Sequence, residues 1–134
     1  MNSQSASIFN LDPTAVAACF AITMLSDRVT HIAAPCSLQV DLAGVYEVQY
    51  KLDLIPNFTG GPIFLNVFMQ VNGVTFATEQ HLLTTGIENN PHGLTYVSLA
   101  AGDMVSLALS ASSAVTMDLL AGLNAYLTVQ MIGS

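Results

Sequence analysis

Three histidines, His31, His81 and His92, are the side chains in this sequence with the widest range of possible chemistry. They are far apart in the chain, and the sequence contains no Cys-x-x-Cys, His-x-His or His-Glu-x-x-His motif. Those spacings are the ones that bring two ligands to one zinc ion, so we predict no metal site from the histidines. Glu79 lies two positions before His81 and would share its face of a strand. We interpret these two residues as a surface pair.

Motifs of nucleophilic and phosphate chemistry are also absent from the sequence. No Gly-x-Ser-x-Gly elbow presents a serine, and no glycine-rich turn precedes a Lys-Ser or Lys-Thr pair. We therefore predict a protein that is not an enzyme, with no catalytic residue and no cofactor. Cys19 and Cys36 allow at most one internal disulfide, and free buried thiols are the favoured interpretation.

Charged side chains are scarce in this chain of 134 residues. Two basic and nine acidic residues give a net charge of −7, so the chain has no basic patch for nucleic acid and no attraction to anionic lipid. Only 8% of the residues are charged, against roughly 25% in ordinary globular domains, and 52% are hydrophobic. We expect neighbouring subunits to cover much of the surface. A monomer decorated by Ser, Thr, Asn and Gln is the alternative.

The most continuous apolar run, residues 15–25, is shorter than the roughly 20 residues of a membrane-spanning helix. No Lys or Arg precedes it, as one would in a signal peptide. We expect a single domain that is made in the cytoplasm and has no membrane partner.

The sequence pattern predicts that the chain folds into short strands separated by turns. Asn72-Gly73 is the strongest hairpin signal, because both residues accept a positive φ. Many short strands at this spacing predict an all-β antiparallel sandwich or barrel. A helix over residues 112–127 is the alternative, which Gly122 disfavours. We place strands near residues 15–25, 36–41, 45–55, 62–71, 74–79, 93–99, 103–111, 114–120 and 123–132.

The expected strands are of two kinds. Residues 45–55 alternate between apolar side chains and Glu47, Gln49, Lys51 and Asp53, a pattern typical of a strand with one face in water. Residues 62–71 and 123–132 are apolar on both faces, which favours contact with a neighbouring subunit on the second face. We predict that Phe64, Phe68 and Tyr126 lie in this contact between subunits.

Residues 1–12 are polar and predict an N-terminal arm, followed by a single domain over residues 13–134. Ile8, Phe9 and Leu11 form the only apolar cluster of this arm. We predict that these three side chains attach the protein to a partner.

Three sequence features lie in an order that resembles a known superfamily. They are Gly44 with Tyr46 at the start of a strand, the Asn72-Gly73 turn, and Leu99, Gly102 and Asp103 before another strand. The sequence over about residues 30–132 resembles the jelly-roll superfamily of the complement first-component globular head and tumour necrosis factor. It looks most like the bacterial and phage members that cap collagen-like stalks or stand on particle surfaces.

The resemblance implies a jelly roll of about eight to ten strands that forms a symmetric homotrimer. The nine glycines are scattered, so the chain has no collagen-like stalk of its own. Some relatives bind calcium near the trimer apex, for which Asp103, or Glu88 with Asn89 and Asn90, could supply oxygens. Turn capping and loop solvation are the favoured interpretation of these residues, and we predict no metal site.

We interpret the sequence as that of a non-enzymatic structural protein. It would be a homotrimer that decorates and stabilises the outside of a large particle, with a bacteriophage capsid as the expected partner and the virion surface as its location. The alternative is a ligand- or receptor-binding module on a spore coat, an adhesin or a fibre tip on a bacterial surface. In that alternative, loops 57–62 and 85–93 would contact a glycan or a protein.

Overall fold

The computed structural model of the chain describes residues 8–17, 23–26, 29–32, 37–119 and 125–133. In this part of the chain every regular element is a strand, which confirms the all-β prediction. The helical alternative for residues 112–127 is wrong where the chain is described, because strands β12 and β13 occupy it. No helix in the described residues has the length and apolar character to span a membrane. The strands are β1 (Ile8–Leu11), β2 (Val16–Ala17), β3 (Thr23–Ser26), β4 (Val29–Ile32), β5 (Ser37–Val40), β6 (Gly44–Leu52), β7 (Leu54–Asn57), β8 (Ile63–Val71), β9 (Val74–Leu83), β10 (His92–Leu99), β11 (Met104–Ala111), β12 (Val115–Leu119) and β13 (Ala125–Gly133).

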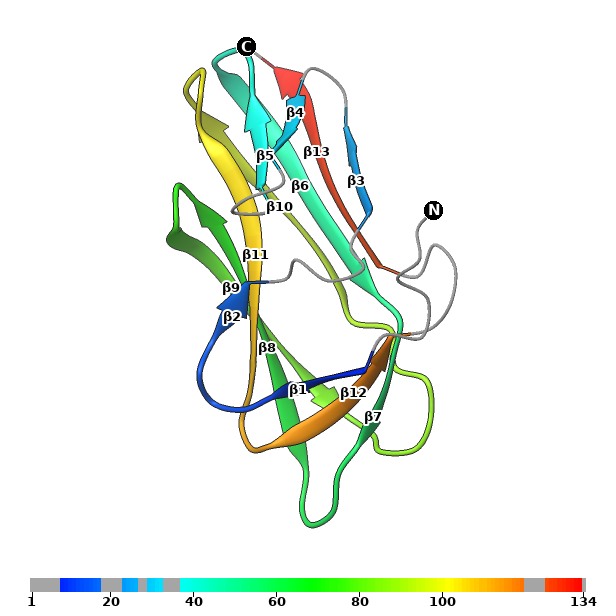
Figure 1. Cartoon of the computed structure of the whole chain (residues 1–134). Coiled ribbons are helices and arrows are strands. Elements are labelled where there is room, and N and C mark those ends of the chain that lie inside the picture. Colours follow the sequence, from blue (N-terminus) through cyan, green and yellow to red (C-terminus); the bar gives the residue numbers. More distant parts are fainter. Residues whose placement is uncertain (1–7, 18–22, 27–28, 33–36, 120–124, 134) are drawn as a thin grey trace.

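The strands form an antiparallel sandwich that is closed at one end by a small sheet (Figure 1). One large sheet has the order β4-β5-β11-β8-β9, with β2 also paired to β11, and the other has the order β10-β6-β13-β3. The small sheet is β1-β12-β7. The chain crosses repeatedly between the large sheets, as in the passages from β9 to β10 and from β10 to β11, which is the winding of a jelly roll. One pair, β13 with β3, is parallel.

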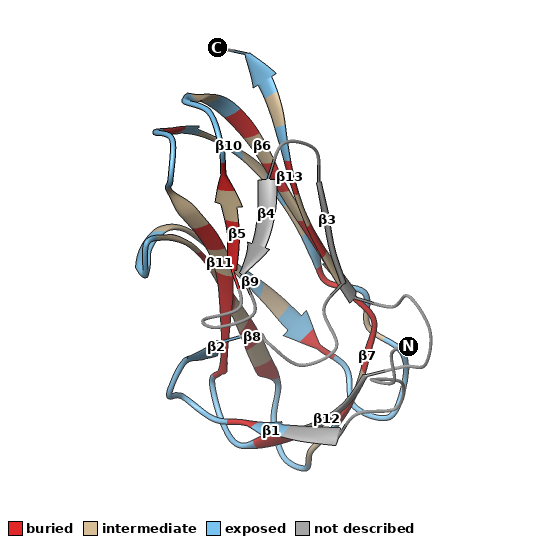
Figure 2. Cartoon of the chain, turned by 45° about the horizontal axis from the view of Figure 1, so that its top comes forward, coloured by how far each residue is buried: buried red, intermediate tan, exposed pale blue. Residues whose placement is uncertain are grey.

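The core lies between the two large sheets, and strand alternation supplies its side chains. Tyr46, Val48, Tyr50 and Leu52 point inward from β6 and are fully buried. The inward residues of β8, β11 and β13 meet them in one hydrophobic cluster. Figure 2 shows the resulting alternation of buried and partly exposed residues along β6 and β8. Each fully buried aliphatic side chain contributes about 1.5–3 kcal/mol, so this periodicity is the main stabilising feature of the fold.

A bend at Asp53 divides the strand expected over residues 45–55 into β6 and β7, which lie in different sheets. Asp53 is only 9% exposed, and its Oδ1 accepts a hydrogen bond of 2.6 Å from Asn90 Nδ2. Leu54 next to it exchanges two backbone hydrogen bonds with Asn89. The prediction that Asp53 shares the water-facing side with Glu47 is therefore wrong, because a partner 37 residues away holds its carboxylate inside the bend.

Two of the predicted turns are confirmed. Asn72 and Gly73 join β8 to β9 with φ values of 52° and 82°, the left-handed pair that a two-residue hairpin requires. Gly102 has a φ of 92°, and Asp103 Oδ2 accepts a hydrogen bond of 2.9 Å from the backbone N–H of Ala100. Gly44 is the first residue of β6, as expected, and it is not among the described residues with positive φ.

Strand structure begins before Pro13, where the sequence suggested an arm. Ile8–Leu11 pairs antiparallel with β12, and Leu11 is 3% exposed within the core cluster. The sequence also did not suggest β4, which pairs with β5. Both strands have only four residues, too few to show a clear alternation, and their existence depends on partners elsewhere in the chain.

Candidate assembly face and loop-end pocket

The outer face of the β4-β5-β11-β8-β9 sheet carries no ionisable side chain on the described parts of its three long strands. We call this surface the uncharged face. On β8 its side chains alternate with buried ones, and the strand register brings the three strands together across the sheet. On β11, Ala108 and Ser110 of this face are themselves buried. They are Phe64, Asn66, Phe68 and Gln70 on β8, Thr78, Gln80 and Leu82 on β9, and Met104, Ser106, Ala108 and Ser110 on β11.

Apolar and polar side chains alternate in rows on the uncharged face. Phe64 is half-buried and pairs with Leu82, which is 59% exposed. Next to this pair, Gln80 Nε2 donates to Asn66 Oδ1 at 3.1 Å, and Asn66 Nδ2 donates to Ser110 Oγ at 3.2 Å. Polar groups that already bond to one another lose less when water is removed, so the cost of dehydrating this face is reduced.

The outer face of the β10-β6-β13-β3 sheet is different, and we call it the charged face. The register places Lys51 beside His92 and Glu47 beside Tyr96, all pointing away from the core. This agrees with the predicted polar side of the strand expected over residues 45–55 for Glu47 and Lys51, though not for Asp53. The face also exposes apolar side chains, since Tyr96 is 57% and Leu94 is 42% exposed.

The structure separates the three residues that were predicted to form one trimer interface. Phe64 and Phe68 lie on the uncharged face, whereas Tyr126 is opposite Lys51 in the register and lies on the charged face. The inner sides of the two sheets share one core, so their outer faces point away from each other. Tyr126 and the two phenylalanines therefore do not form one continuous patch on a subunit.

A polar cluster lies between the two sheets, where their edge strands β9 and β10 approach. Tyr50 Oη donates to Glu79 Oε1 at 2.5 Å and lies 2.7 Å from His81 Nε2. With its proton directed to Glu79, the Tyr50 oxygen is left to accept from His81 Nε2–H, which assigns the tautomer of a neutral imidazole. Glu79 and His81 share one face of β9, as expected, but the face points inward and is partly buried.

Burial and the hydrogen bond to Glu79 raise the pKa of Tyr50 above its ordinary value of 10.0. Burial lowers the pKa of His81 below 6.5, while the Glu79 carboxylate acts in the opposite direction and His92 adds to the lowering. Tyr50 therefore keeps its proton at neutral pH and cannot act as a base. The cluster joins β6 to β9 through three side chains, which is a structural tie between the sheets.

Glycine at position 93 is a steric requirement of this cluster. A Cβ at Gly93 would overlap the Glu79 carboxylate and lie 2.7 Å from Tyr50 Cε2. Sequence reasoning did not find this cluster, because Tyr50 lies 29 residues from Glu79 and occurs in a strand with an ordinary apolar alternation.

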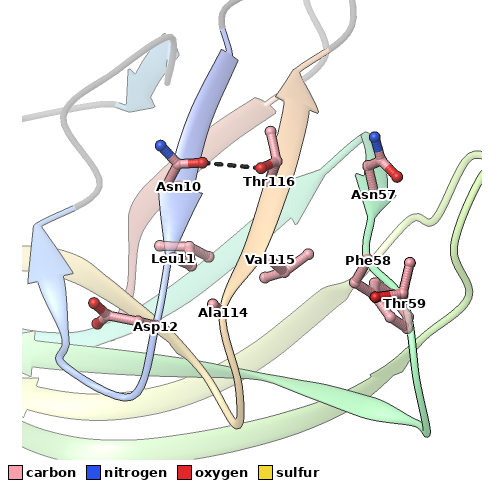
Figure 3. Close-up of a pocket in the computed structure, with 9 residues that line it drawn as sticks. All are labelled: Asn10, Leu11, Asp12, Asn57, Phe58, Thr59, Ala114, Val115 and Thr116. Carbon is pink, nitrogen blue, oxygen red and sulfur yellow. Dashed lines mark hydrogen bonds between the residues drawn. The ribbon is translucent and has the colours of Figure 1, made fainter.

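A pocket of about 430 Å³ lies at the end of the sandwich where the small sheet closes it (Figure 3). We call it the loop-end pocket. Strands β1 and β12 form one side, and the segment that follows β7 forms the other. Its lining residues are Asn10, Leu11, Asp12, Asn57, Phe58, Thr59, Ala114, Val115 and Thr116.

The two loops that the sequence suggested for ligand contact are tied together near this pocket. Thr85 Oγ1 accepts from the backbone N–H of Phe58 at 3.1 Å and lies 3.3 Å from the carbonyl oxygen of Pro56. The backbone N–H of Gly86 also donates to Pro56 O at 2.9 Å. The segment 57–59 is therefore held in place by the loop that follows β9.

The residues considered for calcium do not converge. Asp103 accepts from the backbone N–H of Ala100 in its own turn at 2.9 Å and from Asn72 of the β8–β9 hairpin at 3.0 Å. In another loop, Asn90 Nδ2 donates to both Asp53 and Glu88. Within the described part of the chain, no group of three or more His, Cys, Asp or Glu side chains is arranged to hold a metal ion.

Of the predicted attachment residues, Leu11 is a core side chain. Ile8 and Phe9 belong to β1 by their backbone pairing, and their side chains lie outside the described part of the chain. Cys19 and Cys36 also lie outside the described residues, as does the side chain of His31.

Comparisons with known proteins give similarity to solved structures and to no family. No family model matches the chain, and no curated protein matches it. Among solved structures, the chain is similar to "Structure of Eiger TNF from S. frugiperda", with 15% identity and a TM-score of 0.45 over 69% of each chain. At this level of similarity the match says nothing about partners or activity.

Proposed function

We propose that this chain is a non-enzymatic structural protein that associates as a homotrimer and decorates the outside of a large particle, with a bacteriophage capsid as the particle. The observation that carries the proposal is the uncharged face. A sheet face that borders water usually carries charged side chains, and interface centres are depleted of them. Phe64, Phe68 and Leu82 lie on this face among polar groups that bond to one another.

Charge supports another copy of the same chain as the occupant of this face. Each chain has a net charge of −7, so two copies repel each other wherever their carboxylates approach. The uncharged face lets them approach without placing like charges in contact. Burial of its apolar side chains then supplies up to about 1.5–3 kcal/mol for each large one that becomes fully covered.

The uncharged face is smaller than a standard interface between two subunits. Three strands of about nine residues span about 30 Å by 14 Å, or about 400 Å². A standard interface buries about 800 Å² on each partner. A stable trimer therefore needs contacts beyond β8, β9 and β11, and β5 with Gln39 at its exposed side continues the same sheet.

Two features of the sequence support the proposal that the trimer decorates a particle. It contains no catalytic motif, and it resembles jelly-roll proteins of particle surfaces. Ile8 and Phe9 remain in the proposal as attachment residues. Leu11 does not, because the core already covers it.

The first experiment is light scattering coupled to size exclusion at low micromolar concentration. A single species of three times the 14.1 kDa chain mass is expected. A species of 14.1 kDa that persists at higher concentration would contradict the trimer. Particles isolated from the source and imaged by electron microscopy then test decoration, since trimeric surface density should disappear when the gene is deleted.

A further inference from the structure

We propose that the loop-end pocket binds a neutral saccharide unit. This function is separate from assembly, because the pocket lies at the end of the sandwich and shares no residue with the uncharged face. It would remain if the chain were a monomer.

The pocket has the dimensions of a small-molecule site. Its volume of about 430 Å³ falls within the roughly 300–1,000 Å³ of such sites. A bound water takes only about 30 Å³, so the pocket is much larger than a hydration site. A pyranose ring or a disaccharide fits this space.

The lining combines apolar and polar side chains, as Figure 3 shows. Leu11 and Val115 lie between Asp12 on one side and Phe58 and Thr59 on the other. A sugar ring has apolar C–H patches and a periphery of hydroxyl groups, so it matches such a surface. The half-buried Phe58 ring packs against the core and supplies a rigid apolar wall.

Hydrogen-bonding groups of both kinds remain for a ligand. Asn10 Oδ1 accepts from Thr116 Oγ1 at 2.9 Å, which fixes the amide and leaves Nδ2 to donate. Asp12 Oδ1 accepts from the backbone N–H of Thr14 at 2.8 Å, and its second oxygen can accept from a sugar hydroxyl. Among the described residues, no hydrogen bond engages the exposed side chain of Asn57. Amides and carboxylates pair well with vicinal hydroxyls, which donate and accept at once.

The same lining disfavours other ligand classes. Among the described residues of the lining, Asp12 alone is ionisable, and the chain is acidic, so phosphates and acidic sugars are repelled. Calcium takes six to eight oxygen ligands, usually from several carboxylates, and one carboxylate in a wide pocket does not meet that need. The polar side chains of the lining also make the site unsuitable for an acyl chain.

The test uses the full-length chain labelled with ¹⁵N and titrated with galactose, mannose and N-acetylglucosamine, with glucuronic acid as the acidic comparison. We expect saturable shifts in the amide signals of residues 10–12, 57–59 and 114–116 with at least one neutral sugar, at millimolar affinity. Glucuronic acid should cause no shift. No response to any sugar of the panel, or shifts that lie elsewhere, would overturn the proposal, as would equal binding of glucuronic acid.

Two variants make the assignment specific. Asn57→Ala should weaken binding by about two- to tenfold, because it removes hydrogen bonds to the ligand without touching the core. Asp12→Asn keeps the side-chain shape and should also weaken binding, since a charged acceptor makes the stronger bond. Gln130→Ala on β13, an exposed amide outside the pocket, is the matched control and should bind like the parent. Unchanged affinity in Asn57→Ala and Asp12→Asn would show that the pocket is not the site.

Discussion

The two outer faces of the sandwich expose similar apolar side chains but differ in charge. Leu82 on the uncharged face and Tyr96 on the charged face are 59% and 57% exposed. Exposed apolar residues alone are common on monomers and therefore do not separate the two surfaces. The difference is that Glu47, Lys51 and His92 lie on one outer face, whereas the outward side chains on the described long strands of the other sheet include no ionisable group. Charge placement is thus the better guide to which face a partner covers.

The largest expected effect comes from a carboxylate at the centre of the uncharged face. Phe68→Asp should dissociate the trimer, because burying an unpaired carboxylate costs several kcal/mol. Light scattering measures the mass, and circular dichroism verifies that the chain remains folded. Tyr96→Asp on the charged face is the matched control and should stay trimeric. If Tyr96→Asp dissociates the trimer and Phe68→Asp does not, the assignment of the two faces is reversed.

An isosteric change separates charge from shape. Asn66→Asp adds one negative charge to the uncharged face with almost no change in volume, and it should weaken assembly by at least tenfold, or about 1.4 kcal/mol. Gln49→Glu adds the same charge beside Lys51 on the charged face and should have no measurable effect on assembly. Sedimentation at several concentrations compares the two. Equal dissociation constants would mean that charge placement does not decide the interface.

A change between the sheets should affect stability and leave assembly intact. Gly93→Ala forces a Cβ against Glu79 and Tyr50 and should destabilise the fold by about 1–3 kcal/mol, as other overpacking substitutions do. Gly61→Ala is the control, since a Cβ there meets nothing within 4 Å. Urea unfolding measures both. A Gly93→Ala variant as stable as the parent would show that the polar cluster does not hold the sheets together.

A smaller effect is expected from His81. Its pKa is lowered in the folded chain, mainly by burial, so its contribution to stability is complete above the unfolded value of 6.5 and is lost as the pH falls below it. The melting temperature should therefore decrease between about pH 7 and pH 5, and His81→Gln should reduce this decrease. Assembly through the uncharged face should change little over the same range. If the melting temperature of His81→Gln depends on pH as strongly as that of the parent, other titrating groups cause the dependence.

The smallest effect concerns the turn that contains Asp103. The Ala100 backbone N–H and the Asn72 amide lower the pKa of Asp103 below 3.8, so its contribution is present above that value and is lost as the pH falls further. Asp103→Asn should lower the melting temperature slightly at pH 7 and remove part of the acid dependence below about pH 4. An Asp103→Asn variant that retains the full acid dependence would contradict this role.

Several local features could be predicted from the sequence because they depend on residues that are adjacent in the chain. The alternation in Gly44–Leu52 and Ile63–Val71 predicts both strands and their inward sides, since successive side chains of a strand point to opposite faces. The Asn72-Gly73 hairpin and the Asp103 cap are equally local, because the backbone needs of a turn lie within four residues.

Other features depend on residues that are distant in the chain. Alternation shows that Tyr126 and Phe64 each lie on the outward side of their own strand. It does not show which sheet each strand joins. The sequence therefore predicted one interface where the structure has two opposite faces. The bend at Asp53 depends on Asn90, and the buried cluster of Tyr50 depends on β9.

The sequence by itself determined the all-β class, the inward side of the long strands and the shortage of charge. Only the tertiary structure decided where the shortage lies, which is on one outer face of the sandwich. It also decided that Leu11 belongs to the core and that residues 10–12 and 57–59 line one pocket. The physical reason is that side-chain alternation is a property of the local backbone, whereas the choice of strand partners is set by burial and hydrogen bonding across the whole chain.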